Sequence, residues 1–441
     1  MVLTRAERYL AALKSVDPVR LNGRVEEVVG LFIESRGPRA SLGEICLVYG
    51  GRNDEPIRAE VVGFRAGRVL LMPLGDISGV SPGSEVIATG SPLCVPVGDE
   101  LLGRVLDGLG HPIDGRGELH TAHMRSVMAE PPSPLRRRRV HEPLETGVRA
   151  IDGVLTCGKG QRIGIFSGSG VGKSVLLGML ARSSRADVNV IALIGERGRE
   201  VREFIERDLG SEGLKRSVIV TVTSDQSPLL RVKGAMGALA IAEAFRDAGL
   251  DVCFMMDSVT RCAMAQRELG LAVGEPPATK GYTPSVYALL PRILERAGMS
   301  HTGSITGFFT VFVEADDLND PIADTVRSIL DGHIVLSRRI AMTGHYPAID
   351  VLESVSRVML DVAAPAHLES ARRVVEILAR HRDAEDLLSV GAYARGANPK
   401  TDRAIDLVDD VRAFLRQGVG EASAFGATQT GLAALAQRFG A

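Results

Sequence analysis

The residues best suited to chemistry lie in one glycine-rich stretch, GIFSGSGVGKSVLL, at 164–177. Glycines at alternate positions let backbone N–H groups turn inward around phosphate oxygens, at the positive end of a helix. Lys173 can reach the β- and γ-phosphates of a nucleotide as a point charge, and Ser174 can offer its hydroxyl to Mg²⁺. The loop residues that we predict to contact the nucleotide are Gly168, Ser169, Gly170, Val171, Gly172, Lys173, Ser174 and Val175.

One position departs from the phosphate-loop pattern G-x-x-x-x-G-K-[ST]. Ser167 stands where the pattern has its first Gly. The position lies at the exit of the expected strand 162–166, where a small side chain suffices and Gly is needed only if φ is positive. We therefore predict a working nucleotide loop. The alternative is a glycine-rich turn that binds no ligand.

A phosphate loop needs an acidic residue nearby to support the metal ion. The run DVCFMMD, 251–257, is a buried strand by composition, and Asp257 stands at its carboxyl end. That is the place of the Walker-B carboxylate in P-loop proteins. The alternative is an Asp that only caps the following helix.

Hydrolysis also needs a group that orients water. In IALIGERGREV, Glu196 follows the expected strand Val188–Ile194, at the edge where ligands bind in doubly wound sheets. A carboxylate there can polarise a water molecule for in-line attack on the γ-phosphate. From position alone, Glu196 could instead be an exposed residue that pairs with Arg199 or Arg202.

The sequence predicts three kinds of structure around these residues. Short β-rich runs fill 20–94 and predict a small closed barrel. From about 150, near-continuous apolar strands alternate with amphipathic helices, which predicts an α/β fold with a doubly wound parallel sheet, and the chain after about 355 is nearly all helical. The expected domains are 1–19, an amphipathic helix for partner docking; 20–97, the barrel; 98–355, the nucleotide-binding ATPase domain; and 356–441, the helical C-terminal domain.

Composition narrows the class of protein. The 441 residues carry a net charge of −2, which gives no global sign of a nucleic-acid partner. The five cysteines show no metal-ligand spacing and read as reduced, buried thiols. No apolar run is long enough for a membrane helix, so we expect a cytoplasmic protein. The four arginines at 136–139 read as a solvated linker, with a polyanion-binding patch as the alternative.

These motifs resemble the hexameric ATPases of rotary ATP synthases and of type III protein export. GERGREV resembles their catalytic-glutamate segment, and the span from SITGFFTVFVE to HYPAID is similar to the catalytic β subunit of the synthase. GEPPATKGYTPSVYALLPRILERAG, 274–298, and GAYARGANPKTDRAI, 391–405, resemble the export ATPases, with EPPATKGY closer to the flagellar branch than to the injectisome branch. The resemblance implies a RecA-like core, ATP and Mg²⁺ as ligands, and a barrel and a helical domain on either side of that core.

The resemblance also implies roles for individual residues. The family usually has Gly or Ala where this chain has Ser167, which is another small residue. The roles that it assigns are Lys173 and Ser174 for phosphate and Mg²⁺, Glu196 for the general base, Arg197 toward the γ-phosphate, Asp257 for the Walker-B acid, Arg261 for the nearby arginine, Tyr346 and Phe414 for the adenine pocket, and Arg357 for the arginine finger.

One chain would then carry both the catalytic set and the finger, which the synthase divides between two subunits. The resemblance therefore implies a homohexamer at the cytoplasmic face of the export apparatus, coupling ATP hydrolysis to unfolding and delivery of exported substrates. Its expected partners are a regulatory, stator-like protein at the N-terminus, a stalk protein, and export chaperones with their substrates. Residues 1–19 could instead be a frayed cap on the barrel, or could add affinity for acidic lipid.

Three other functions remain as alternatives. An injectisome ATPase would share nearly all of these motifs. A non-catalytic nucleotide-binding subunit of a rotary-type ring would lack the catalytic glutamate, whereas this chain has Glu196. An RNA-translocating hexamer would need aromatic stacking residues on its barrel, where 20–94 offers only Phe32, Tyr49 and Phe64.

Overall fold

The computed structural model describes residues 22–50, 55–121, 123–313 and 320–440. Contacts between Cα atoms divide the chain into two compact units, Met1–Leu93 and Cys94–Ala441. The helix predicted for 1–19 lies outside the described residues. Among the described residues, we find no helix with the length and apolar character needed to span a bilayer.

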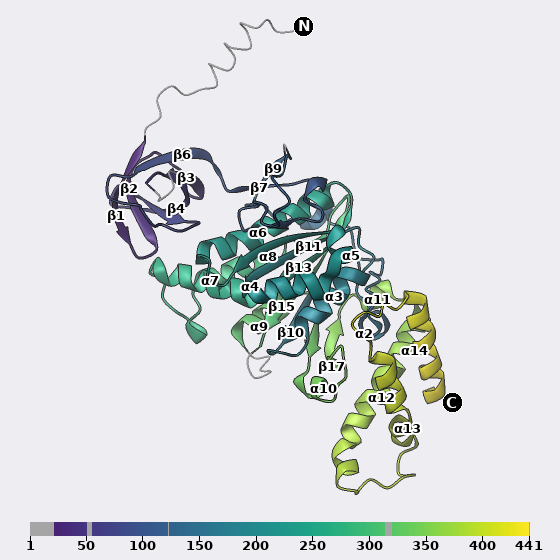
Figure 1. Ribbon diagram of the computed structural model, residues 1–441. Coiled ribbons are helices and arrows are strands. Elements are labelled where there is room, and N and C mark those ends of the chain that lie inside the picture. Colours follow the sequence, from purple (N-terminus) through teal and green to yellow (C-terminus); the bar gives the residue numbers. More distant parts are fainter. Residues whose placement is uncertain (1–21, 51–54, 122, 314–319, 441) are drawn as a thin grey trace, which may run out of the picture. The chain divides into compact units, whose positions relative to one another are not determined.

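The first unit is the predicted closed barrel, with neighbouring strands in the order β1-β2-β5-β4-β3-β6 and β1 pairing back to β6 (Figure 1). Alternate residues point inward, so that Val25, Ile33 and Val61 lie in an apolar core. Closure leaves no open sheet edge among the described strands of this unit. The strands are β1 Gly23–Val29, β2 Phe32–Arg36, β3 Glu44–Val48, β4 Ile57–Arg65, β5 Arg68–Pro73 and β6 Glu85–Pro92.

The second unit is built on a mainly parallel sheet in the order β17-β16-β10-β15-β13-β11-β12-β8, with β14 antiparallel to β15. All neighbours along this path are parallel except β17, which runs antiparallel to β16 at the sheet edge. The strands are β8 Val105–Leu106, β10 Arg162–Ser167, β11 Val188–Glu196, β12 Ser217–Thr223, β13 Asp251–Asp257, β14 Gly298–Met299, β15 Ser304–Phe312, β16 Gly332–Leu336 and β17 Ile349–Ser356. This confirms the predicted fold class, although β17 was not foreseen.

Helices cover both faces of this sheet (Figure 1). Leu176 and Leu180 of α3 share a core with Ile165 and Ile191, whereas α6 packs against the other face, near Ile194. Burial on both faces explains why the strands are nearly continuous apolar runs. The helices of this part are α2 Arg149–Val154, α3 Lys173–Ser183, α4 Gly198–Glu203, the π-helix η3 Phe204–Leu209, α5 Gly210–Lys215, α6 Pro228–Asp247, α7 Val259–Ala272, α8 Pro284–Leu294, α9 Pro321–Ile329 and α10 Arg338–Met342.

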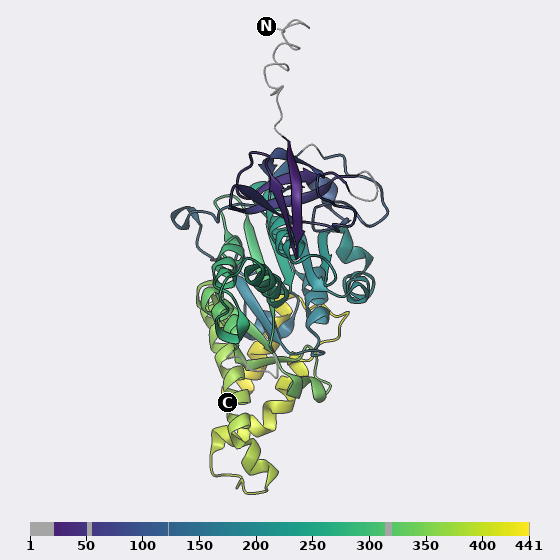
Figure 2. The same ribbon diagram turned by 90° about the vertical axis from the view of Figure 1, so that its left-hand side faces the viewer.

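The chain ends in helices, as predicted. After the short α11 Met359–Val362, the long α12 Pro365–Ser389, α13 Pro399–Leu415 and α14 Phe425–Gly440 pack against one another and against α2 (Figure 1 and Figure 2). Their apolar faces join the core on the α3 side of the sheet. The helices therefore belong to the same compact unit as the sheet, and the boundary at 355/356 stays a prediction.

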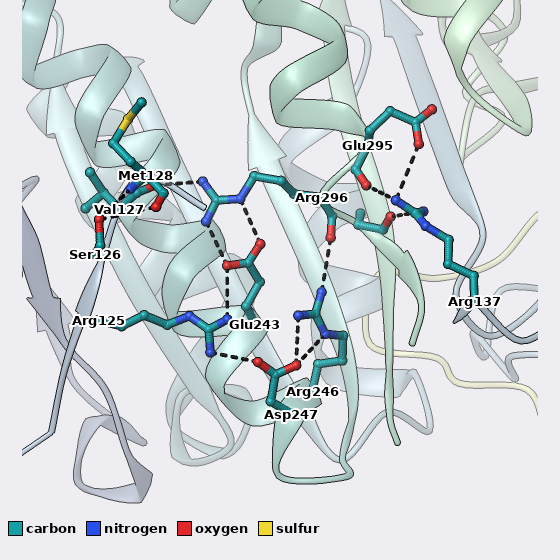
Figure 3. Close-up of polar contacts among 11 residues, drawn as sticks. Arg125, Ser126, Val127, Met128, Arg137, Glu243, Arg246, Asp247, Glu295 and Arg296 are labelled. Carbon is teal, nitrogen blue, oxygen red and sulfur yellow. Dashed lines mark hydrogen bonds and ion pairs between the residues drawn. The ribbon is translucent and has the colours of Figure 1, made fainter. Parts of the chain in front are cut away.

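A buried ion pair fastens the segment around the short strand β9 (Met124–Ser126) to the sheet's helices (Figure 3). Arg296 Nε and Glu243 Oε1 lie 2.8 Å apart, and the two residues are 3 % and 1 % exposed. Arg296 also donates to the carbonyl oxygen of Val127 at 2.8 Å, and Arg125 reaches Asp247 at 2.8 Å. The segment around β9 and the segment at Arg296, which are far apart in sequence, are thus both held on α6. β9 pairs with β7, Cys94–Pro96.

The arginine run at 136–139 is not the free linker that we expected. Arg137 donates to the carbonyl oxygen of Ala297 at 3.1 Å, and Arg138 donates to that of Thr302 at 2.9 Å. The expected solvated linker was wrong for Arg137, which is half-buried because its guanidinium satisfies carbonyl groups that follow α8. Arg138 makes its contact while staying exposed. Local sequence does not show which distant carbonyls will meet these side chains.

Candidate active site

The phosphate loop joins β10 to α3 as predicted. Gly170 and Gly172 have φ of 76° and 95°, in the left-handed region that favours glycine. Gly172 is the N-cap of α3, so Lys173 and Ser174 begin the helix, where free backbone N–H groups and the helix dipole favour an anion. The loop is shaped to bind phosphate.

Ser167 is the last residue of β10 and is buried. Among the described non-glycine residues, only Ala66 and Lys280 have positive φ, so Ser167 takes an ordinary backbone conformation. This confirms that the position does not require glycine. The Ser167 Oγ is buried and finds no hydrogen-bond partner among the described residues.

Lys173 brings together the two acids that the sequence singled out. Its ammonium group hydrogen-bonds Asp257 Oδ1 and lies 3.4 Å from Glu196 Oε1. Asp257 ends β13 and Glu196 ends β11, which pair in parallel, so both carboxylates leave the sheet at the edge that carries the phosphate loop. Burial alone would lower the pKa of Lys173, but the charges of Asp257 and Glu196 raise it above its ordinary value.

Thr310 positions Asp257, and the sequence analysis missed it. Its Oγ1 donates to Asp257 Oδ1 at 2.8 Å from the neighbouring strand β15. The residue is fully buried. The available signal was one hydroxyl in the otherwise apolar run GFFTVF. Its meaning depends on the register that sets Phe309 beside Met256, which the local pattern does not contain.

Glu196 has the electrostatics of a general base. Burial raises the pKa of its carboxyl to about 7, although the positive charge of Lys173 pulls it down and the nearby Asp257 raises it. A carboxyl with a pKa near neutrality can accept a proton efficiently at physiological pH. The structure gives Arg199 and Arg202 other partners, Glu203 and Glu206, so the alternative pairing is not present.

Two arginines lie close to Glu196 in sequence or in space, and their surroundings differ. Arg261, on α7, is close enough for its charge to lower the pKa of Glu196, and its side chain packs against Gly195. Arg197 has a side chain that is 75 % exposed, with its guanidinium 3.8 Å from Glu200. The structure does not bring Arg197 to Lys173, so its contact with the γ-phosphate stays a prediction.

Tyr346 lies at the loop, whereas Phe414 packs elsewhere. The Tyr346 ring stands beside the Cα of Gly172, where a Cβ would meet it at 3.6 Å, and the residue is partly exposed. An aromatic face at this place can stack on a purine. The ring of Phe414 instead packs against Gly153 of α2 and Gly431 of α14. Its part in an adenine pocket stays a prediction.

Arg357 lies at the opposite end of the sheet from the phosphate loop. It follows β17, whose Ser356 pairs with Gly332 at the start of β16, while Leu336 at the end of β16 pairs with Ser167. Four residue steps along β16 separate those two levels, roughly 13 Å at the usual rise. Arg357 is exposed, and its backbone N–H donates to the carbonyl oxygen of Asp331 at 3.0 Å.

The donor atoms at the site fit a magnesium nucleotide. Ser174 offers a hydroxyl in the first turn of α3, and Asp257 offers a buried carboxylate. Mg²⁺ prefers such oxygen ligands and usually completes its shell with water and substrate phosphates. The described ranges hold no cluster of three or more His, Cys, Asp or Glu residues that could bind a metal ion.

A parallel sheet with a phosphate loop, a buried acid on the neighbouring strand and a carboxylate poised near neutrality defines a P-loop nucleoside triphosphatase. Comparison with known proteins agrees. Residues 147–356 match the nucleotide-binding domain of the ATP synthase alpha/beta family, residues 25–90 match its beta-barrel domain, and residues 363–434 match the T3SS EscN ATPase C-terminal domain.

Individual relatives span almost the whole chain. The "Flagellum-specific ATP synthase" of Bacillus subtilis is 53 % identical over 418 residues, 95 % of each chain. The "Type 3 secretion system ATPase" of Xanthomonas euvesicatoria is 52 % identical over 96 % of this chain and 95 % of its own. The assembled ATPase EscN, solved with its central stalk EscO from enteropathogenic E. coli, is 43 % identical with a TM-score of 0.87 and covers 94 % of this chain and all of its own.

The chain therefore belongs to the ATP synthase α/β family and, within it, to the ATPases of flagellar and type III secretion systems.

Proposed function

We propose that the chain is the Mg²⁺-dependent ATP hydrolase of a flagellar export apparatus, working as a homohexameric ring that couples hydrolysis to unfolding and delivery of exported proteins. Flagellar relatives and the export-type C-terminal domain support this proposal. The injectisome is the second candidate, because a type III secretion ATPase matches the chain almost as well.

Each catalytic residue takes a role that its position supports. The loop amides and Lys173 would hold the triphosphate, while Ser174 and Asp257 would hold Mg²⁺, which would supply positive charge to the phosphates. Glu196 orients the attacking water and accepts its proton. When the triphosphate enters, the Lys173 ammonium turns from the carboxylates toward the phosphates. That movement leaves Glu196 free to bind water.

The main observation in support of a ring assembly is the position of Arg357. A guanidinium at the far end of the sheet cannot reach the phosphate loop of its own chain. It is exposed and, among the described residues, makes only a long contact, 3.5 Å, with the carbonyl oxygen of Arg327, so it can turn to enter the loop of a second copy. Such a contact uses two different surfaces of one chain, and repeating it generates a ring where the rotation between copies closes. An arginine supplied in this way stabilises charge in the transition state, typically by ~10³–10⁵ in rate.

The partners follow from resemblance and remain part of the proposal. We place a regulatory partner at residues 1–19, a stalk protein in the ring, and chaperones with their substrates on the helical domain 356–441. The central stalk of EscN supports the second of these. We also place the chain in the cytoplasm, docked at the cytoplasmic face of the export apparatus.

Two experiments test this proposal. Arg357→Ala should leave nucleotide binding intact and remove most ATP turnover, and near-normal turnover would contradict the ring. Deletion of the gene, scored for motility and for effector secretion in parallel, separates the two candidate systems. Loss of motility with normal effector secretion is expected, and the reverse pattern would assign the chain to an injectisome.

The adenine contact has its own test. The chain contains no tryptophan, so Tyr346→Trp introduces a single indole reporter. If the ring at 346 stacks on the base, ATP should change its fluorescence saturably, while inorganic tripolyphosphate should not.

A further inference from the structure

Gln417 is a buried polar side chain that the catalytic scheme leaves without a role. It follows α13 and is 3 % exposed. Its Oε1 accepts a hydrogen bond from the backbone N–H of Arg149 at 2.9 Å. Its Nε2 donates to the carbonyl oxygens of Gly147 at 2.8 Å and Glu421 at 2.7 Å. Because buried amides are costly unless they are paired, this satisfied side chain fixes the backbone at residue 417.

That backbone in turn holds Tyr346. The N–H of Gln417 donates to the carbonyl oxygen of Tyr346 at 2.8 Å. The ring of Tyr346 stands beside Gly172, the N-cap of the phosphate-loop helix α3. Gln417 therefore links the residue proposed to stack on adenine to the start of α2 and to the segment between α13 and α14.

Both ends of this link make further hydrogen bonds. Gly147 donates its N–H to the buried carboxylate of Asp152 at 2.9 Å, which fixes the carbonyl that Gln417 uses. Arg149 Nε donates to the carbonyl oxygen of Phe414 at 2.7 Å, at the end of α13, and its guanidinium pairs with Glu421. The side chain of Gln417 is thus held on one side by the buried Gly147 and on the other by the half-buried Arg149 and the exposed Glu421, which pair with each other.

We infer that Gln417 is a positioning residue for the adenine base, which sets the place of the Tyr346 ring without touching the nucleotide. This inference rests on the proposed stacking role of Tyr346. The contact with the base is made equally in the ground state and the transition state. Its loss should therefore raise the Kd and KM for ATP and leave kcat nearly unchanged.

The test compares ATP with a ligand that lacks the base. Gln417→Met keeps the side-chain volume and removes all three side-chain hydrogen bonds. Calorimetric titration of the full chain should show a Kd for ATP raised by about tenfold, with the Kd for inorganic tripolyphosphate within about twofold of wild type. Gln429→Ala is the matched control, because its Nε2 contacts His367 Nδ1 at 3.2 Å on another part of the helical domain, and it should leave both constants unchanged.

Tyr346→Ala separates the failure of this inference from the failure of the proposed function. If Tyr346→Ala weakens ATP binding and Gln417→Met does not, the positioning role is wrong and the stacking role stands. If Gln417→Met weakens ATP and tripolyphosphate equally, the residue supports the whole site and the inference is also overturned. If Tyr346→Ala leaves ATP binding intact, the stacking role itself is wrong. Should Gln417→Met not fold, Gln417→Glu, which keeps an acceptor for Arg149, is measured in the same way.

Discussion

Arg357 and Lys173 stand at opposite ends of one parallel sheet. Lys173 begins the helix that follows β10, whereas Arg357 follows β17 beside the start of β16. Parallel strands place all their carboxyl ends at the same end of the sheet, where the phosphate loop lies. A residue at the opposite end of the strands therefore cannot join the phosphate site of its own chain. We propose that each chain holds most of a site at one end of its sheet and offers, from the other end, the arginine that completes the site of a neighbour.

The phosphate loop should tolerate a change at Ser167 but not at Lys173. Ser167 has an ordinary backbone conformation, and its hydroxyl has no partner among the described residues, so Ser167→Ala should hydrolyse ATP at about the wild-type rate. Lys173→Ala removes the charge that contacts the phosphates and should lower kcat by at least about a hundredfold. Steady-state ATPase assays on both variants check this. A strong defect in Ser167→Ala would show that its hydroxyl takes part in turnover.

Turnover should depend on the ionisation of Glu196. Its pKa is raised to about 7, chiefly by burial, and only the deprotonated carboxylate can accept a proton from water. Activity is therefore present above this pH and is lost as pH falls through it. A pH profile of kcat/KM should show a single ionisation near 7, and Glu196→Gln should lose both the activity and the profile. A wild-type profile that is flat from pH 5.5 to about 8.5 would argue against Glu196 as the base.

Thr310 should influence the metal requirement through Asp257. Thr310→Val keeps the shape of the side chain but removes the hydrogen bond to Asp257 Oδ1. Loss of such a supporting contact typically weakens metal binding by about tenfold or more. The Mg²⁺ concentration that gives half-maximal ATPase rate should rise accordingly, while Thr310→Ser, which keeps the hydroxyl, should behave like wild type. Equal metal requirements in the two variants would exclude this role.

The buried pair of Arg296 and Glu243 should matter for stability far more than a surface pair. Arg296→Ala leaves the Glu243 carboxylate buried and without its main partner, and it should lower the free energy of unfolding by about 3–5 kcal/mol. Arg373→Ala removes an exposed pair with Glu369 and should cost under about 1 kcal/mol. Chemical denaturation of both variants makes the comparison, and similar losses would contradict the importance of burial.

Much of this site could be predicted because strand ends in a parallel sheet share an edge. Asp257 and Glu196 each follow an apolar run, so their meeting at the phosphate loop needed no knowledge of register. Thr310 could not be found in this way, since its role depends on which residue of β15 lies beside Asp257. β11 also runs beyond the expected strand Val188–Ile194, because a bulge at Gly195 lets the strand continue to Glu196.

Elsewhere in the fold, too, local sequence predicted the elements better than their contacts. β17 is an antiparallel edge strand whose first three residues are buried and whose other residues are half-buried or exposed, a weak signal beside the apolar runs of the central strands. The helical C-terminal region was clear from its periodicity, but the pattern could not show that Phe414 packs between α2 and α14. Such contacts are set by tertiary packing, which local sequence does not encode.

The central claim, that the arginine finger comes from a second copy, is tested most directly by mixing two inactive variants. Glu196→Gln keeps the finger and loses the base, whereas Arg357→Ala keeps the base and loses the finger. In mixed rings assembled at equal concentrations, about a quarter of the interfaces would pair an intact Glu196 with an intact Arg357 from a neighbour. ATPase activity should therefore reappear on mixing, at about a quarter of the wild-type rate per chain. A mixture that co-assembles and stays as inactive as its components would contradict the account.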